Sequence, residues 1–323
     1  MNATFVKNFI QSRVKKYNRS TVLNISLSKN SQSGSNANSS VNDGLTFNDY
    51  YGLRVQDEDI SLNYPDVAEV LAVYESLDNA EPVLDAITFN SIVDVSNNAI
   101  IGENIVGTGG AVGRVVTKPS ANTLGIVYLN TIRFSSGERV KFEESTIETS
   151  ITNITLGKYK DITSKFDLDK GQKEQFYDYS RLVRRRGESA PSRRLKVIFD
   201  HFTVPASDTG DLFTVNSYPE AAFGKFVPEI GDDEVRASDT LDFRPRVSVF
   251  NSTSSSPFDF TSRGGFGDTP EGPKLIMAPN ESSLIDYRFY LGRVDKLFIS
   301  SSGQFTLVKG VPSVNLKEPD SPD

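Results

Sequence analysis

Apolar and polar residues alternate along several short stretches of the chain, which is the pattern of half-buried β-strands. Residues 21–28 alternate in this way, with an apolar side chain at every second position from 23 to 27. Residues 67–77 fit both helical and extended spacing, but their Val and Tyr content and their short length favour a strand. The apolar-rich segment at 195–202 predicts a further strand.

Short apolar runs separated by Gly, Asn, Ser and Pro turns fill residues 96–150, and this spacing predicts a small β-barrel or meander. The glycines at 107–113 lack the spacing of a dinucleotide-binding loop and the Lys-Ser/Thr pair of a P-loop, so they predict a β-turn. Residues 287–299 and 303–308 predict a final hairpin, and the segment that begins at Gly171 predicts a short helical turn.

These patterns together predict a mainly β fold, with several small antiparallel β-sandwich or β-barrel modules and few short helices. Residues 28–44 are dominated by Ser, Asn and Gly, which is typical of a flexible linker. The predicted divisions are an N-terminal strand with this linker (1–44), a β segment of the main domain (45–95), a barrel-like module (96–152), and the main β domain with its C-terminal hairpin (153–323).

The composition narrows the chemistry that the chain can perform. Its 323 residues carry a net charge of -7 with a pI near 5.0, so general nucleic-acid binding is not expected. The absence of cysteine removes disulfides, thiol nucleophiles and zinc–thiolate sites, and the one histidine, His201, rules out a multi-His metal site within one chain. No apolar run reaches the roughly 18–20 residues that cross a bilayer, so membrane insertion is not expected. The N-terminus does not read as a signal peptide, and no cofactor is expected.

A cluster of arginines forms one group of candidate interface residues. Its members are Arg184, Arg185, Arg186, Arg193 and Arg194. Such a cluster can bind an anion or the carboxylate of a partner protein. The alternative, which we favour, is a solvated loop whose arginines pair with nearby acidic residues. Those acidic residues are Asp167, Asp169, Asp178 and Glu188.

Acidic and basic residues alternate densely in a second group of candidates. Its members are Asp239, Asp242, Arg244 and Arg246. One interpretation is a carboxylate pair for glycoside hydrolysis, which needs two carboxyls about 5–10 Å apart. The other is a buried structural ion-pair hub, which we favour because the carboxylates are bracketed by arginines and the chain holds no Trp to stack on a sugar. No residue of the chain is assigned a catalytic role.

Several segments of the chain resemble a family of virion structural proteins from T4-like marine cyanophages and related tailed phages. They are KYKDIT at 158–163, FDLDKGQKEQFYDYSRLVRR at 166–185, APSRRLKVIFDHF at 190–202, SDTLDFRPRV at 238–247, YLGRVDKLFI at 290–299 and GENIVGTGGAVGRV at 102–115. The resemblance covers roughly residues 45–310. These strings are distinctive but carry no known chemistry.

The resemblance implies a non-enzymatic structural component of a phage tail, baseplate or fibre. Its partners are then expected to be other virion proteins and copies of itself, and its location the virion, after assembly in the host cytoplasm. An alternative function is a tail module that binds or depolymerises a host-surface carbohydrate, which the abundant Tyr and the Asp/Arg pairs favour and the lack of Trp disfavours. A third is a secreted adhesin built from Ig-like domains, which the missing signal peptide disfavours.

Overall fold

The computed structural model describes residues 4–7, 11–25, 55–90, 94–220, 225–231, 235–250, 282–285 and 291–321. The chain forms two compact units, one made of residues 11–277 and the other of residues 1–10 with 278–323. The described residues are mainly β, in several antiparallel sheets and a closed barrel, which confirms the predicted fold class. The predicted linker at 28–44 lies outside the described residues.

A four-stranded antiparallel sheet forms the centre of the larger unit. Its order is β11 (Tyr159–Asp161), β4 (Val67–Ser76), β14 (Leu195–Thr203) and β2 (Lys16–Ile25). The strands predicted at 67–77 and 195–202 are therefore confirmed as β4 and β14. Strand β14 is buried along almost its whole length, because both faces of the sheet are covered.

A three-stranded sheet covers one face of this central sheet. Its order is β12 (Phe166–Asp169), β13 (Tyr179–Arg184) and β3 (Asp59–Pro65). Val197 and Phe199 of β14 pack with Ile60 and Leu182 in the core between the two sheets. The two layers therefore form a small β-sandwich, in which the inward side chains of both sheets meet.

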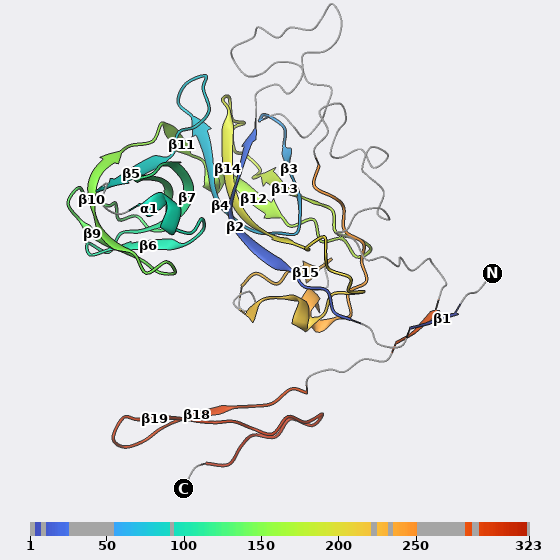
Figure 1. Ribbon diagram of the computed structural model, residues 1–323. Coiled ribbons are helices and arrows are strands. Elements are labelled where there is room, and N and C mark those ends of the chain that lie inside the picture. The colour runs from blue at the N-terminus through green and yellow to red at the C-terminus, as the bar shows by residue number, and fades with distance from the viewer. Residues whose placement is uncertain are drawn as a thin grey trace, which may run out of the picture. The chain divides into compact units, whose positions relative to one another are not determined.

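A closed barrel covers the other face. Its six strands, in the order β10-β5-β8-β7-β6-β9, are β5 (Asp85–Phe89), β6 (Asn104–Gly107), β7 (Val112–Ser120), β8 (Thr123–Tyr128), β9 (Arg139–Phe142) and β10 (Glu148–Thr155). The short helix α1 (Val95–Asn98) is seen within the outline of the ring of strands in Figure 1, and its one buried residue, Val95, packs in the barrel core. On the outside of the barrel, Val116 and Val127 pack against Ile198 of β14.

The barrel confirms the predicted small β module, but its boundary differs from the predicted one. Strand β5 closes the ring between β10 and β8, so the module begins at Asp85 rather than at residue 96. The glycine-rich segment is the turn between β6 and β7, where the N–H of Gly107 donates to the carbonyl of Ala111. Gly110 lies at φ +86°, which a non-glycine residue rarely adopts.

The helical turn predicted after Gly171 is wrong. The backbone there folds into a tight loop closed by a bridge between Gln172 and Tyr177, and the N–H of Asp178 donates to the carbonyl of Gly171. Gly171 has φ +70°, a conformation that does not start a right-handed helix. The remaining elements of this unit are η1 (Thr163–Lys165), η2 (Val215–Ser217), η4 (Ala237–Asp239), β15 (Glu229–Ile230) and β16 (Val235–Arg236).

The described residues of the smaller unit form two pairs of strands. Strand β1 (Thr4–Lys7) pairs in parallel with β17 (Ser282–Ile285). Strands β18 (Lys296–Ile299) and β19 (Phe305–Val308) form the predicted C-terminal hairpin, which is confirmed. This hairpin belongs to the smaller unit rather than to the main domain in which the sequence analysis places it.

Candidate functional site

The candidate arginines of the 184–194 region have separate partners. Arg184 donates from Nη1 to the backbone carbonyl of Gln56 at 2.9 Å. Arg185 pairs with Asp167 through an Nη2–Oδ1 contact of 2.7 Å between two exposed side chains. Arg193 donates to the side chain of Asn79. Arg186 is exposed, and Arg194 is partly buried.

These contacts agree with the solvated-loop interpretation for part of the cluster. Arg185 pairs with Asp167 as that interpretation requires, and the neighbouring Arg181 donates from Nη2 to Asp169 Oδ2 at 2.8 Å. Glu188 contacts Lys165 rather than an arginine of the cluster. Paired, water-exposed guanidinium groups of this kind do not form a preorganised anion site.

The second group of candidates separates into buried and exposed members. Asp242, Arg244 and Arg246 are buried, whereas Asp239 is exposed at the end of η4 and accepts a hydrogen bond from Ser238. Asp239 therefore differs from Asp242 in both exposure and hydrogen-bond partners. Arg246 donates from Nη2 to the backbone carbonyls of Pro65 and Phe202.

Asp242 and Arg244 form a bidentate ion pair in the interior. Nε of Arg244 lies 2.9 Å from Oδ1 of Asp242, and Nη2 lies 2.8 Å from Oδ2. Burial by itself raises the pKa of the Asp242 carboxyl, but the hydrogen bonds and charge of Arg244 outweigh it and hold that pKa below its ordinary value. Asp242 is therefore an ionised acceptor at neutral pH.

This pair belongs to a closed ring of polar side chains, all buried except the partly buried Gln172, which we call the polar ring. Its six members are Lys15, Asp66, Gln172, Arg244, Asp242 and Tyr177. Gln172 links the two halves on one side, because its Nε2 donates to Asp66 Oδ1 at 3.2 Å and its Oε1 accepts from Arg244 Nη2 at 3.1 Å. Tyr177 links them on the other side, where its hydroxyl donates to Asp242 and accepts from Lys15 Nζ at 3.1 Å.

Lys15 occupies a fully enclosed position of the polar ring. Its side chain is fully buried, and Nζ lies 2.7 Å from Asp66 Oδ2. Aromatic rings surround the ammonium group, with centroids 4.5 Å away for Tyr177, 4.5 Å for Tyr218 and 4.7 Å for Phe213. The Tyr218 hydroxyl accepts a third hydrogen bond from Nζ at 2.9 Å. Each of the three ammonium protons therefore has an acceptor, and the faces of the rings stabilise the charge.

The residues of the polar ring come from four separate segments. Lys15 directly precedes β2, and Asp66 forms the corner between β3 and β4. Gln172 and Tyr177 lie at the two ends of the loop between β12 and β13, and the Asp242–Arg244 pair follows η4. Asp66 has φ +61°, a left-handed conformation that Asp tolerates better than most residues.

Burial also sets the protonation of the neighbouring groups. The pKa of Tyr177 lies well above its ordinary value, because burial and the nearby Tyr218 and Asp242 all disfavour a phenolate. Tyr177 therefore stays protonated and donates to Asp242. His201, which is buried in β14, has its pKa lowered to about 4 by burial and by the charge of Arg246.

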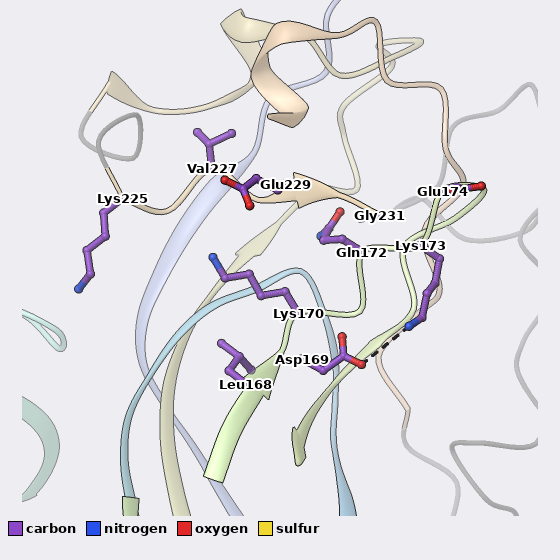
Figure 2. A pocket seen from close by; sticks show the side chains of 10 residues that line it. All are labelled: Leu168, Asp169, Lys170, Gln172, Lys173, Glu174, Lys225, Val227, Glu229 and Gly231. Atoms are coloured by element: carbon purple, nitrogen blue, oxygen red, sulfur yellow. Dashed lines mark ion pairs between the residues drawn. The ribbon is translucent and has the colours of Figure 1, made fainter. Parts of the chain in front are cut away.

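An open cleft of about 660 Å³ lies beside the polar ring, with which it shares Gln172 (Figure 2). Its lining residues are Leu168, Asp169, Lys170, Gln172, Lys173, Glu174, Lys225, Val227, Glu229 and Gly231. The lining contains three lysines and three carboxylates, of which Lys173 and Asp169 lie 3.8 Å apart. The lining contains no aromatic residue on which a sugar ring can stack, among the residues that the structure describes.

Sequence reasoning identifies Asp242 and Arg244 but misses Lys15, Asp66 and Gln172. The two identified residues are neighbours in the chain, so their charge alternation is visible in the sequence. Lys15 is one of two adjacent lysines in a polar stretch, and its partner Asp66 lies 51 residues away. No local pattern separates this lysine from a solvated one.

No family model, curated protein or solved structure matches the chain. Within the described ranges, no group of three or more His, Cys, Asp or Glu side chains is placed to hold a metal ion. In the same part of the chain, no helix combines the length and apolar character needed to cross a membrane.

Proposed function

We propose that the protein is a non-enzymatic structural component of a tailed-phage virion, in the tail, baseplate or fibre, and that it acts through protein–protein assembly. The resemblance of the segments at 166–185, 190–202 and 238–247 supports the virion assignment. The observation that carries the assembly role is an exposed apolar face on the C-terminal hairpin.

This hairpin face consists of two cross-strand pairs. Leu297 stands opposite Leu307, and Ile299 stands opposite Phe305. Positions two residues apart on a strand point to the same side, so the four side chains share one face. Their exposed fractions are 64% for Leu297, 66% for Ile299, 69% for Phe305 and 55% for Leu307.

Such a hairpin needs a partner. Isolated two-stranded hairpins are marginally stable in water, and large exposed apolar faces mark interaction sites. Covering the exposed part of these four side chains stabilises an assembly by about 4–7 kcal/mol per copy. A second copy of the chain offers the same face, and two identical faces meet around a two-fold axis in an isologous contact.

The buried carboxylates support a structural rather than a hydrolytic role. Asp242, one of the two candidates for glycoside hydrolysis, is held between Arg244 and Tyr177 with no exposed surface on its side chain. Asp239 is exposed elsewhere. An enzyme of that class needs both carboxyls to flank a bound sugar.

Mass spectrometry of purified phage particles tests the virion assignment. We expect peptides from residues 166–199 and 236–249 in the particles, at a fixed ratio to known structural proteins through successive purification steps. Peptides that occur in the lysate but are lost from purified particles would refute the assignment.

Analytical ultracentrifugation tests the assembly role. We expect the purified chain to self-associate, and Ile299→Asp with Phe305→Asp to abolish this association because two charges then stand on the apolar face. Thr306→Asp is the matched control, since Thr306 is exposed and pairs with Phe298 on the opposite side of the hairpin. A wild-type chain that stays monomeric at all concentrations tested, or a Thr306→Asp variant that loses association equally, would contradict the assigned face.

A further inference from the structure

The Lys15–Asp66 pair combines a primary amine with a carboxyl group in a site closed to solvent. Nζ and Oδ2 are 2.7 Å apart, with 0% and 2% of the two side chains exposed. Lys15 is the one lysine among the described residues that is buried. We propose that Lys15 and Asp66 condense to an intramolecular isopeptide bond, which covalently links the segment before β2 to the corner between β3 and β4.

The reaction needs the amine and the carboxyl group in their neutral forms. An ammonium ion is not a nucleophile, and a carboxylate is a poor electrophile. In an interior lined by Phe202, Phe213 and Tyr218, charges are poorly solvated, so a proton can pass from Nζ to Oδ2 along their hydrogen bond. The products are a neutral amine and a neutral carboxylic acid, still in contact.

The geometry directs the amine at the acid. Tyr177 and Tyr218 accept the other two protons of Nζ, at 3.1 Å and 2.9 Å, so the lone pair left by the transferred proton points toward Asp66. The carboxyl carbon lies one C–O bond beyond Oδ2. Holding the two groups in this orientation replaces a collision between molecules with a step inside one molecule.

The bonds formed and the bonds broken in this reaction balance without any further reactant. Nζ attacks the carboxyl carbon, and the resulting tetrahedral species carries negative charge on Oδ1. Gln172 Nε2, 3.2 Å from Oδ1, donates to that oxygen. A proton then passes from the nitrogen to the hydroxyl formed at Oδ2. Water leaves, and Oδ1 becomes the carbonyl oxygen of the new amide.

Charge compensation is preserved in the product. The condensation removes one positive and one negative charge together, and Asp242 and Arg244 remain paired. A buried ion pair is thus replaced by a neutral amide, which is less costly to keep away from water. Gln172 and Tyr177 act as positioning residues in this scheme.

The chain contains an internal comparison. Lys225 Nζ lies 2.5 Å from Glu69 Oε2, closer than in the buried pair, but 70% of the Lys225 side chain is exposed. The Lys225 side chain is open to water whereas that of Lys15 is enclosed, so proximity without enclosure is not expected to lead to condensation. We expect a crosslink at Lys15 and none at Lys225.

Mass spectrometry of the folded, then denatured, full chain tests the crosslink. The wild-type chain should be lighter than its sequence by the mass of one water molecule. Because an aspartate can also lose water as a cyclic imide, proteolysis must yield a branched peptide that joins Lys15 to Asp66. Full sequence mass, separate unmodified peptides for the two residues, or water loss at another aspartate would each overturn the proposal.

Variants sharpen the test. Lys15→Arg keeps the positive charge but removes the nucleophile, so its mass should equal that of its sequence, whereas Lys225→Arg should still lose water. Asp66→Asn provides a second route that does not depend on the first variant, because it condenses with loss of ammonia. Its crosslinked product should have the same mass as the crosslinked wild type.

Tyr177→Phe distinguishes a positioning role from a purely structural one. This variant keeps the aromatic ring but removes the hydroxyl that holds Nζ. We expect the crosslinked fraction to grow at least several-fold more slowly during refolding, with the same final product. An unchanged rate would remove Tyr177 from the scheme, and formation of the branched peptide in denaturant would show that the fold does not direct the reaction.

Discussion

Replacement of Arg244 by alanine should destabilise the larger unit more than any loss of a surface ion pair. The side chains of Arg244 and Asp242 are 8% and 0% exposed, so the variant leaves a carboxylate in the interior without its cation. It also removes the donors to the carbonyl of Lys173 at 2.8 Å and to Gln172 Oε1 at 3.1 Å. Breaking a buried pair by removing one partner costs about 3–5 kcal/mol.

Equilibrium urea denaturation, followed by far-UV circular dichroism, measures this change. With a urea dependence of about 2–3 kcal/mol per M, Arg244→Ala should lower the midpoint by roughly 1–2 M. Arg185→Ala is the matched control, since Arg185 and Asp167 are 52% and 62% exposed and their contact is also short, at 2.7 Å. We expect it to leave the urea midpoint almost unchanged, because water and salt screen an exposed pair.

A double-mutant cycle separates the pair from its surroundings. Because the penalty of Arg244→Ala arises largely from the stranded carboxylate, adding Asp242→Ala should recover about 1–3 kcal/mol relative to the sum of the single variants. If Arg244→Ala and Arg185→Ala unfold at the same urea concentration, Asp242 is not buried as an ion and the assignment of the polar ring fails.

Two further predictions concern backbone and pH. Gly171→Ala should be far less stable to heat than Gly187→Ala. Both glycines have positive φ, but a Cβ at Gly171 meets the carbonyl oxygen of Asp178 at 2.4 Å, whereas one at Gly187 meets nothing within 4 Å. Equal melting temperatures would contradict the close approach at Gly171. His201 has a pKa of about 4 in the folded chain, against an ordinary value of 6.5. Between these two pH values the unfolded chain binds more protons than the folded chain. The free energy of unfolding should therefore fall by about 3 kcal/mol as the pH drops from 6.5 to 4. His201→Gln should lack this contribution in urea titrations repeated at each pH, and an unchanged pH profile would show that the imidazole is solvated.

Much of the fold follows from local sequence pattern, because strands have a period of two residues and turns need particular residue types. The strand at 67–77, the barrel and the C-terminal hairpin are all visible in this way. The loop after Gly171 is not. Its polar and aromatic residues suit a helical turn locally, but a φ of +70° and the pairing of Gln172 with Tyr177 override that preference.

The candidate site likewise has one part that the local sequence predicts and one part that it does not. Asp242 and Arg244 are two residues apart, so their opposite charges are visible as a local pattern in the sequence. Lys15 meets Tyr177 across 162 residues and Tyr218 across 203, contacts that exist only once the sandwich has formed. A lysine is also the residue type least expected in a core, so sequence reasoning assigns it to the surface.

Buried polar contacts also determine the register of strand β14, which the apolar pattern leaves undecided. Strand β14 is buried on both faces, so its hydrophobicity alone does not fix its register against β4 and β2. Asp200 on that strand accepts from the backbone N–H of Ser20 at 2.7 Å, from the Tyr17 hydroxyl at 2.8 Å and from Arg114 Nη1 at 2.9 Å. A slip by one residue would leave this carboxylate and its donors unpaired in the interior, at a cost of several kcal/mol. The polar contacts thus select one register from several that bury similar apolar area, and the polar ring does the same for the segment before β2.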